Sequence, residues 1–361
     1  MRLTVLNVSY PLAPVSAGTA GGAEQVLSTL DAALVQHGCR SLVIAPEGSK
    51  CQGLLLPTAL VPQVLDEDAK HRARERHRDA IRRAIDTFPV DVVHLHGVDF
   101  MHYLPQPGVP VIVTLHLPPG FYDHQAFGTS RPETYLVCVS QSQACKCPPN
   151  ADITSVIGNG VPLNWFRPTG AFRKGSYVLY MGRMCPEKAP HLAMDAARSA
   201  GVPCWIAGNV FPYPTHLRYF DEFIEPRLAS YGHHFVGSVG GMRKRDLIAG
   251  AKCLLVPSQI AETSSLAAME AFACGAPVIA FRTGALSEVV RHGATGFVVE
   301  NVEEMADAIL ELKKIAPADC RTEAEQRFSS ETMVRRYFEL YQQASQAAVS
   351  AIQRMELQPA A

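Results

Sequence analysis

The hydrophobic positions of this chain fall into short apolar runs that alternate with longer stretches of helical periodicity. Short apolar runs bounded by turn residues indicate buried strands. In the first half they cover residues 3–8, 41–45, 91–96, 111–116, 135–140 and 153–157. In the second half they cover residues 177–181, 203–207, 234–236, 253–257, 277–280 and 296–299. Strands that alternate with helices predict an α/β protein whose parallel sheets are covered by helices on both faces.

These strands are too many for one compact sheet, so we expect two doubly wound, Rossmann-like domains. We place them at residues 1–168 and 169–330, joined by a hinge at 167–175 that is rich in Pro, Gly and charge. A C-terminal helix in 331–361 would pack back across the N-terminal domain. Ligands of open parallel sheets bind beyond the C-terminal strand ends. Two such sheets that face each other would form a cleft between the domains.

Composition narrows the function classes. The 361 residues are 47% hydrophobic and 19% charged, as in an ordinary globular protein. A net charge of −1 argues against general nucleic-acid binding. The 10 cysteines have no regular spacing, and no apolar run is long enough to span a bilayer. We therefore expect reduced thiols and a cytoplasmic location.

The most informative segment is 262–270, Glu-Thr-Ser-Ser-Leu-Ala-Ala-Met-Glu, in which no charged residue separates the two glutamates. An apolar run follows, so we predict a loop ending at Glu262, a helix from about Ser264 to Gly275, and then a buried strand. At a rise of ~1.5 Å per residue, the carboxylates lie roughly 12 Å apart along the helix axis. Free amide groups at the helix N-terminus favour anions. This arrangement suits a polyol, a diphosphate and a second diol, the outline of a nucleotide sugar.

Two turns that follow predicted strands point the same way. Gly21 and Gly22 precede a helical pattern, and glycines there let backbone amides approach a phosphate; the alternative is a simple tight turn. The spacing matches neither a dinucleotide fingerprint nor a phosphate loop ending in Gly-Lys-Ser/Thr. Arg183 and Lys188 follow another strand and could neutralise a diphosphate without a metal. Their alternative is a pair of solvated surface cations.

Three histidines end two neighbouring strands of the first half, His94 and His96 on one and His116 on the next. A zinc site is one interpretation, but no acidic partner has ligand spacing. We favour histidines that pack and form hydrogen bonds along a cleft, with His116 contacting a sugar.

The segment 70–83 forms an amphipathic helix whose polar face is basic. A solvated face is its ordinary explanation. Peripheral contact with an anionic membrane surface, or with an acidic acceptor, is the alternative.

Taken together, the motifs resemble the retaining glycosyltransferases of family 4, which have the GT-B fold. The likeness runs from Met1 to about Val299. It rests on motifs in register, namely Gly21-Gly22-Ala23-Glu24, Thr114-Leu-His116, Val139-Ser140, Gly158-Asn159-Gly160-Val161-Pro162, Gly182-Arg183 with Glu187-Lys188, Ile206-Ala207-Gly208, Phe235-Val236-Gly237, Val256-Pro257-Ser258, Glu262 with Glu270-Ala-Phe-Ala-Cys-Gly275, and Gly284-Ala-Leu-Ser-Glu288 with Gly293-Ala-Thr-Gly296.

The resemblance assigns roles to charged residues and one histidine. Arg183 and Lys188 match the cations that hold the donor diphosphate. Glu262 matches the acid that binds hydroxyls of the donor sugar, and Glu270 the acid that binds ribose hydroxyls. His116 matches the N-terminal-domain histidine that contacts the transferred sugar.

Further donor-binding positions follow from the same likeness. The loop with Gly21 and Gly22 would lie near the phosphates and the acceptor, and backbone around Val239 would contact the base. The remaining donor-binding positions are Gly182, Ser264, Ser265 and Leu266. Many family members have glycine shortly after the first glutamate, where this chain has Thr-Ser-Ser. The identity of the donor therefore cannot be carried over.

The expected reaction moves a sugar from a nucleoside diphosphate to an acceptor hydroxyl on a glycan, a lipid-linked molecule or a small molecule. The anomeric configuration is retained, and neither a metal nor another cofactor is needed. One alternative is a GT-B enzyme of another kind, a sugar-nucleotide epimerase or a phosphorylase. A second is a non-catalytic subunit that binds a sugar nucleotide.

Overall fold

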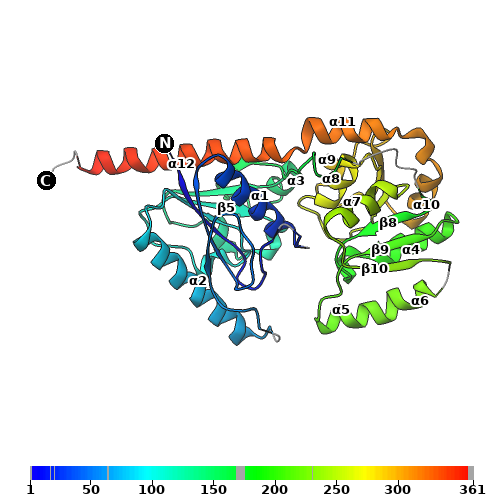
Figure 1. The fold of residues 1–361 in the computed structure, drawn as a ribbon, viewed down its shortest axis with the longest axis horizontal. Helices are drawn as coiled ribbons and strands as arrows, with labels where there is room; N and C mark the ends of the chain where they lie inside the picture. The colour runs from blue at the N-terminus through cyan, green and yellow to red at the C-terminus, as the bar shows by residue number, and fades with distance from the viewer. Residues whose placement is uncertain are drawn as a thin grey trace. The chain divides into compact units, whose positions relative to one another are not determined.

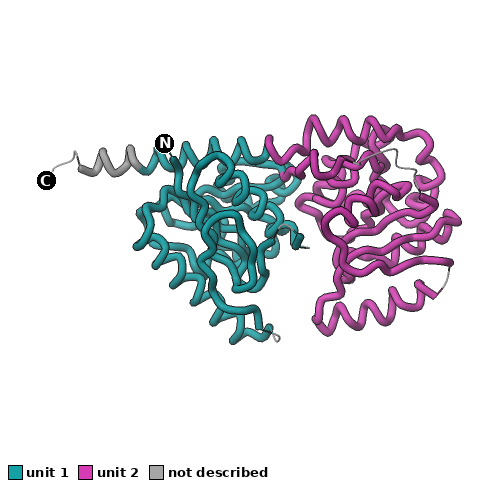
Figure 2. Tube along the Cα trace, viewed as in Figure 1, with its two compact units in different colours: residues 1–158, 332–361 teal, residues 159–331 magenta. Residues whose placement is uncertain are grey.

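The computed structural model describes residues 2–16, 18–19, 21–62, 65–167, 175–229 and 231–356, with side chains as far as residue 348. The chain divides into two compact units (Figure 2). Unit 1 comprises Met1–Gly158 with Thr332–Ala361, and unit 2 comprises Asn159–Glu331. Most of the predicted hinge, residues 168–174, lies outside the described residues.

The described part of unit 1 forms a seven-stranded parallel sheet in the order β3-β2-β1-β4-β5-β6-β7. Its strands are β1 (Thr4–Val8), β2 (Arg40–Ala45), β3 (Leu54–Pro57), β4 (Val92–Leu95), β5 (Val111–Leu115), β6 (Thr134–Cys138) and β7 (Ile153–Val156). The central strands are buried throughout, which explains why they read as continuous apolar runs in the sequence.

Helices cover both faces of this sheet (Figure 1). The α-helices are α1 (Gly22–Gln36), α2 (Glu67–Thr87), α3 (Gln141–Ala144) and α12 (Ser330–Glu356), and short 3₁₀ helices span η1 (Phe100–His102), η2 (Pro119–Phe121) and η3 (His124–Phe127). Leu6 faces the core under α2, and its neighbour Val5 faces the core shared with α1 and α12. Successive strand residues point to opposite faces, so each strand serves both cores.

Most of α12 packs on unit 1 although it follows unit 2 in the sequence. Tyr337 and Tyr341 are fully buried among residues of β1, β4 and α1. Burial of such side chains contributes roughly 1.5–3 kcal/mol each, enough to hold the helix in place. Among the described helices, none has both the length and the apolar composition required of a membrane span.

The described part of unit 2 forms a six-stranded parallel sheet in the order β10-β9-β8-β11-β12-β13. Its strands are β8 (Val178–Met181), β9 (Cys204–Ala207), β10 (His234–Gly237), β11 (Leu254–Val256), β12 (Val278–Phe281) and β13 (Gly296–Val299). The helical segments are η4 (Pro186–Lys188), α4 (Pro190–Ser199), α5 (Pro214–Tyr219), the π-helix η5 (Phe220–Ile224), α6 (Glu225–Leu228), α7 (Gly241–Gly250), α8 (Leu266–Ala273), α9 (Leu286–Val289), α10 (Val302–Leu310), η6 (Leu312–Lys314) and α11 (Pro317–Arg327).

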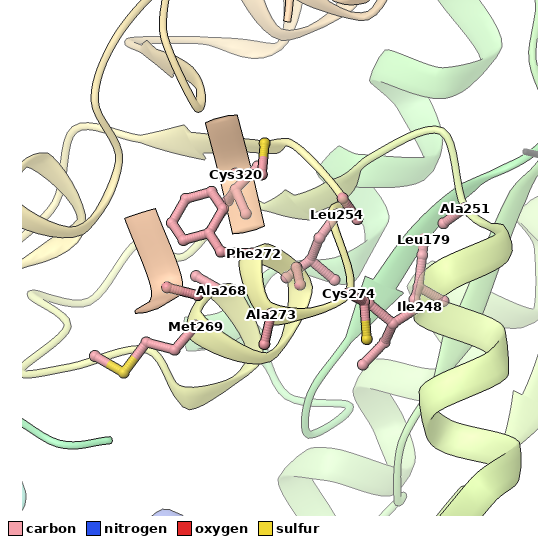
Figure 3. Close-up of a cluster of buried hydrophobic side chains, with 14 of the residues drawn as sticks. Leu179, Ile248, Ala251, Leu254, Ala268, Met269, Phe272, Ala273, Cys274 and Cys320 are labelled. Atoms are coloured by element: carbon pink, nitrogen blue, oxygen red, sulfur yellow. The ribbon is translucent and has the colours of Figure 1, made fainter. Parts of the chain in front are cut away.

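The core beneath α8 combines alanine and cysteine side chains with larger aliphatic ones and Phe272 (Figure 3). Phe272 of α8 and Cys320 of α11 are both completely buried in it. Ala268 and Ala273 on α8 let the helix approach its neighbours closely. This packing fixes the start of α8, and with it the segment that carries Glu262.

Three details differ from the sequence predictions. Strand β3 was not predicted, since its side chains are half-exposed and the run ends in Pro57. The division between units falls after Gly158 instead of after residue 168, because Val161 pairs with Ser329 and Phe166 packs in the core of unit 2. Helix α8 begins at Leu266 and not near Ser264.

Candidate functional site

Two glycines allow the ends of β8 and β9 to lie in close contact. A Cβ atom added to Gly208 would lie 1.7 Å from the carbonyl oxygen of Gly182, and Gly208 has a φ of +152°. The Gly182 N–H donates to the Ala207 carbonyl over 3.0 Å. Any larger side chain at residue 208 would push this loop away. Gly208 therefore fixes where the segment carrying Arg183 and Lys188 begins.

Arg183 and Lys188 flank a short turn at the carboxyl end of β8. The Tyr180 hydroxyl donates to the Arg183 carbonyl oxygen over 2.8 Å. The Arg183 side chain is 42% exposed, and its Nη2 lies 3.8 Å from the Glu187 carboxylate. Ala189, directly after Lys188, has a φ of +47°, a conformation that L-residues rarely adopt. The Arg183 side chain is thus accessible to an anion from solvent, with Glu187 beside it, while the turn holds its backbone in place.

Lys188 forms an ion pair with Glu262. Their Nζ and Oε1 atoms lie 2.5 Å apart, and the carboxylate side chain is only 10% exposed. The backbone of Glu262 is held by the turn at 284–285: the Ala285 N–H donates to the Glu262 carbonyl over 2.7 Å. Gly284 has a φ of +52°, and an added Cβ would lie 2.2 Å from that carbonyl oxygen. The turn thereby positions the acid that the sequence analysis singled out.

The start of α8 lies directly after Glu262. The Ser265 hydroxyl caps the helix by accepting from the Ala268 N–H over 3.3 Å. The Ser264 hydroxyl oxygen is buried and makes no hydrogen bond with any described residue. Leu266, the first helical residue, is partly buried against the core. The segment therefore offers an unpaired hydroxyl beside a helix N-terminus.

Glu270 is paired with a lysine that the sequence analysis did not select. Lys244 Nζ lies 2.5 Å from Glu270 Oε1, and the glutamate side chain is 3% exposed. Burial raises the pKa of Glu270, although the Lys244 ammonium opposes that shift. Lys244 belongs to α7, where it lies among Arg243 and Arg245, and no spacing in the sequence linked that cluster to Glu270.

Val239 belongs to the loop between β10 and α7. Its side chain packs, partly buried, against the core of unit 2. The neighbouring Gly237 has a φ of +70°, and a Cβ there would meet open space. The chain therefore turns sharply at Gly237, whose carbonyl accepts a hydrogen bond from the Gly208 N–H over 2.9 Å.

In unit 1, His116 follows β5 and belongs to a chain of histidines. Its Nε2 shares a hydrogen bond of 3.0 Å with His96 Nδ1. Burial lowers the pKa of His116 to about 3, so the ring is neutral near pH 7. The segments around it are held by Gln143, whose side-chain amide donates to the carbonyls of Leu115 and Leu117. Gln143 is a positioning residue that the sequence analysis missed.

His94 connects this chain to the C-terminal helix. Its Nδ1 shares a hydrogen bond of 2.8 Å with the Tyr341 hydroxyl, and its Nε2 one of 2.7 Å with Thr114. Thr114 in turn bonds the Tyr337 hydroxyl over 2.9 Å. The rings of His94 and His96 lie 4.0 Å apart, so both point to the same face as expected for alternate strand residues.

Gly21 and Gly22 lie at the N-terminus of α1. Gly21 is the residue before the helix, and Gly22 is its first residue. A Cβ on Gly21 would lie 1.8 Å from a carboxylate oxygen of Glu24, so the glycine makes room for that buried side chain. The group beside this helix end is therefore the Glu24 carboxylate, the last residue of the Gly21-Gly22-Ala23-Glu24 motif, to which the sequence analysis assigned no role.

The structure thus brings Gly182, Arg183, Lys188, Glu262 and Ser264 to connected segments at one sheet edge of unit 2. In unit 1, the carboxyl-terminal edge of the sheet carries His116 after β5 and Gly21 and Gly22 after β1.

Two family models match consecutive parts of the chain. The model for glycosyl transferases group 1 matches residues 163–331, and that for glycosyltransferase family 4 matches residues 20–165. Together they cover residues 20–331, which include every segment of the candidate site. The chain belongs to glycosyltransferase family 4. This confirms the resemblance found in the sequence.

Solved structures confirm the architecture. AviGT4, a glycosyltransferase involved in avilamycin A biosynthesis, is 26% identical, with a TM-score of 0.69 over 95% of this chain and 98% of that one. Anabaena HepE, solved in complex with UDP-glucose, is 18% identical, with a TM-score of 0.71 over 97% of this chain and 100% of that one. This family 4 chain has the two-domain α/β GT-B fold.

Curated relatives match over a shorter stretch. D-inositol 3-phosphate glycosyltransferase of Mycobacterium leprae is 33% identical over 178 residues, which is 44% of this chain. The match spans 40% of the length of that relative.

Proposed function

We propose that this family 4 protein transfers a sugar from a nucleoside-diphosphate sugar to an acceptor hydroxyl, with retention of anomeric configuration and without a metal. The observation that carries the proposal is the Lys188–Glu262 pair beside Arg183, the unpaired Ser264 hydroxyl and the start of α8. A polyphosphate needs cations and amide dipoles, and a sugar needs carboxylates and hydroxyls. HepE, which has the same fold, binds UDP-glucose.

The charged residues of the candidate site in unit 2 would each bind a different part of the donor. Arg183 and Lys188 bind the donor diphosphate, together with the backbone of Gly182. Glu262 accepts hydrogen bonds from sugar hydroxyls, and Ser264 adds one more polar contact. Ser265, the N-cap of α8, and Leu266, its first residue, would offer their backbone N–H groups to the donor.

Glu270 and the backbone near Val239 would hold the nucleoside. One Glu270 oxygen is already engaged by Lys244, whose ammonium opposes the rise that burial causes in the pKa of Glu270 and orients the carboxylate. An ionised carboxylate can accept hydrogen bonds from both ribose hydroxyls, whereas a protonated carboxyl group has one oxygen occupied by its own proton. Lys244 is then a positioning residue for this contact.

The N-terminal unit would supply His116 to the transferred sugar. Because its pKa is depressed to about 3, the ring acts as a neutral hydrogen-bonding group and not as a cation. The loop with Gly21 and Gly22 would lie near the phosphates and the acceptor.

The proposed step breaks the bond between the anomeric carbon and the diphosphate oxygen. The acceptor oxygen forms its bond on the same face, and its proton passes to the departing phosphate oxygen. No protein nucleophile is required. The protein contributes fixed positive charge where negative charge develops, a contribution that is often the largest in such catalysis.

A ligand screen tests the donor class first. Melting temperature is measured with UDP, GDP, ADP and dTDP and with their sugars, in the presence of EDTA. A ligand that binds only the folded state raises the melting temperature by mass action. One nucleotide series should raise it; no shift with any of them would contradict the proposal.

Product analysis then separates transfer from the alternatives. With the donor and a panel of hydroxyl acceptors, a transferase forms an α- or β-glycoside of the same anomeric configuration as the donor, visible by NMR. Conversion of the donor alone would indicate an epimerase. Bound pyridoxal absorbance would indicate a phosphorylase, and binding with no turnover a regulatory subunit.

The basic face of α2 supports a separate, testable proposal of peripheral membrane contact. Part of that face is internally paired, since Arg74 bonds Asp99 and Arg78 bonds the His102 carbonyl. Arg72 and Arg76 instead line a surface hollow together with Leu60, which is largely exposed. Sedimentation with anionic vesicles should remove the wild type, and less of Arg72→Ala, from solution; equal recovery with and without vesicles would refute the contact.

A further inference from the structure

Three potential metal ligands converge in unit 2 beside Arg183. The Cys185 sulfur, a Glu187 carboxylate oxygen and a ring nitrogen of His216 all lie within 4.8 Å of one another. Cys185 and Glu187 come from the turn after β8, and His216 comes from α5. Among the described residues, this is the group that brings three such ligand atoms together.

The histidine is buried without a partner for one of its nitrogens. His216 is 8% exposed, and its Nδ1 makes no hydrogen bond with the described residues. Its ring is packed against Tyr213 and Phe211, with centroids 5.1 and 6.4 Å away. A buried polar atom left unpaired typically destabilises a protein by about 1–3 kcal/mol, so an unpaired nitrogen calls for an explanation.

Cys185 is also buried, and nothing in the proposed transfer uses it. Its side chain is completely inaccessible; the thiol makes a weak contact of 3.8 Å with the Arg183 carbonyl and a hydrogen bond with the Glu187 carboxylate. Glu187 is half-exposed and opens the group to solvent on one side. The group therefore combines two buried side chains with one that reaches solvent.

We propose that Cys185, Glu187 and His216 bind a Zn²⁺ ion that ties α5 to the turn between Arg183 and Lys188. Thiolate, imidazole and carboxylate are the ligands that Zn²⁺ takes in proteins, whereas Mg²⁺ prefers oxygen ligands alone. Ordinary zinc bond lengths separate sulfur and nitrogen ligands by roughly 3.5 Å, so small side-chain rotations suffice. A water fills the fourth position. Binding forms a zinc–sulfur bond and releases the thiol proton to solvent.

The ion changes the charge that Arg183 experiences. Without it, the Glu187 carboxylate lies 3.8 Å from the Arg183 guanidinium and partly neutralises it. With it, two ligand charges of −1 cancel the +2 of the metal, so the site is neutral and Glu187 is withdrawn from Arg183. Arg183 is then freer to bind a diphosphate. The ion itself does not touch the donor and takes no part in the transfer step.

Cobalt replaces zinc as a spectroscopic probe. Reduced, full-length protein is titrated with Co²⁺, and a tetrahedral thiolate site gives a sulfur-to-cobalt charge-transfer band with strong visible bands. We expect these bands to saturate at about one Co²⁺ per chain, as in four-coordinate sites. Cys185→Ser and His216→Gln should abolish them.

The matched control is Cys147→Ser, which should keep the bands. Cys147 Sγ lies 3.7 Å from Cys138 Sγ, so that pair is the competing thiol site. Identical spectra for wild type and Cys185→Ser, loss of the bands in Cys147→Ser, or no band in the wild type would each overturn the proposal. If Cys185→Ser fails to fold, His216→Gln decides, with its fold checked by circular dichroism.

Zinc binding has a second readout that is independent of donor binding and turnover. Added Zn²⁺ should raise the melting temperature of the wild type and leave that of His216→Gln unchanged. Equal shifts in both proteins would contradict the site. A positive result here together with no nucleotide binding would support the metal site and refute the proposed function.

Discussion

The carboxyl-terminal edges of the two sheets carry different kinds of side chain. At the carboxyl ends of β4 and β5, unit 1 presents His94, His96 and His116, whose pKa values are lowered by burial. At the carboxyl ends of β8 and β11, unit 2 presents ion pairs, Lys188 with Glu262 most directly. One sheet edge therefore carries neutral hydrogen-bonding groups, and the other carries fixed charge.

The difference follows from what surrounds each edge. His94 is covered by Tyr337 and Tyr341 of α12, and a buried ring without a counter-ion stays neutral. Lys188 and Lys244 of unit 2 each face a carboxylate, so charge is retained even where the pair is largely buried. A charged edge suits an anionic donor, and a neutral edge suits sugar and acceptor hydroxyls.

The largest expected effect comes from breaking the more buried ion pair. In Lys244→Ala, Glu270 is left as a charge that is 3% exposed, and loss of one partner of a buried pair costs about 3–5 kcal/mol. Urea denaturation at pH 7 measures the change. Arg282→Ala is the matched control, because its pair with Glu300 is exposed on both sides and should contribute less than about 1 kcal/mol. Equal losses in the two variants would show that burial of Glu270 does not matter.

The charges that face the donor should affect rate more than stability. Loss of a preorganised charge contact lowers turnover by about 10²–10³-fold, or roughly 3–4 kcal/mol. We expect that range for Arg183→Ala and for Lys188→Ala, measured as sugar transfer at saturating donor. Arg282→Ala should retain wild-type turnover. Arg183→Ala turnover within a few-fold of wild type would rule out its role.

Substitutions that remove hydrogen bonds at the neutral edge of unit 1 should lower the free energy of unfolding. Tyr341→Phe leaves His94 Nδ1 buried without its hydrogen bond, which costs about 1–3 kcal/mol. Tyr337→Phe should cost less, because Thr114 keeps its bond to His94. Urea denaturation of both variants compares them. A larger loss in Tyr337→Phe would contradict the proposed order of the network.

The smallest expected effect is a change in how steeply the free energy of unfolding depends on pH. The folded pKa of His116 is about 3 and that of His77 about 4, both below the value near 6.5 of an unfolded chain. Below pH 6.5 these histidines bind protons in the unfolded state but not in the folded state. The free energy of unfolding therefore falls as the pH drops toward their folded-state pKa values. Each such histidine contributes about 1.4 kcal/mol per pH unit.

His116→Gln should therefore make that slope shallower between pH 6 and pH 5. Denaturation curves at several pH values measure it, and His124→Gln, which changes an exposed side chain, should leave it as in the wild type. An unchanged slope in His116→Gln would mean that the ring is protonated in the folded protein.

The sequence predicted the parts of the fold that local pattern controls. Buried parallel strands read as apolar runs, and the strands around Val5, Ile112 and Leu254 were found for that reason. Strand β3 escaped detection because its side chains are half-exposed and tertiary contacts hold it: it pairs with β2, and just before it the buried Asp31 carboxylate accepts the N–H groups of Gln52 and Gly53. No local pattern encodes such a contact.

The site shows the same limit. Glu262, Arg183 and Lys188 could be selected from their places after strands, but which cation pairs with which acid depends on how distant segments pack. Lys244 and Gln143 lie in the middle of helical segments without any spacing that links them to Glu270 or His116. The role of Gly284 also required the structure, since only geometry shows that a side chain there would collide with Glu262.

The central claim is that the charges of unit 2 bind a nucleoside diphosphate without a metal. Isothermal titration of the nucleotide selected by the thermal screen, in EDTA, tests it most directly. We predict saturable binding by the wild type and at least about tenfold weaker binding by Arg183→Ala, or 1.4 kcal/mol. Equal affinity in both proteins, or binding that appears only when Mg²⁺ is added, would contradict it.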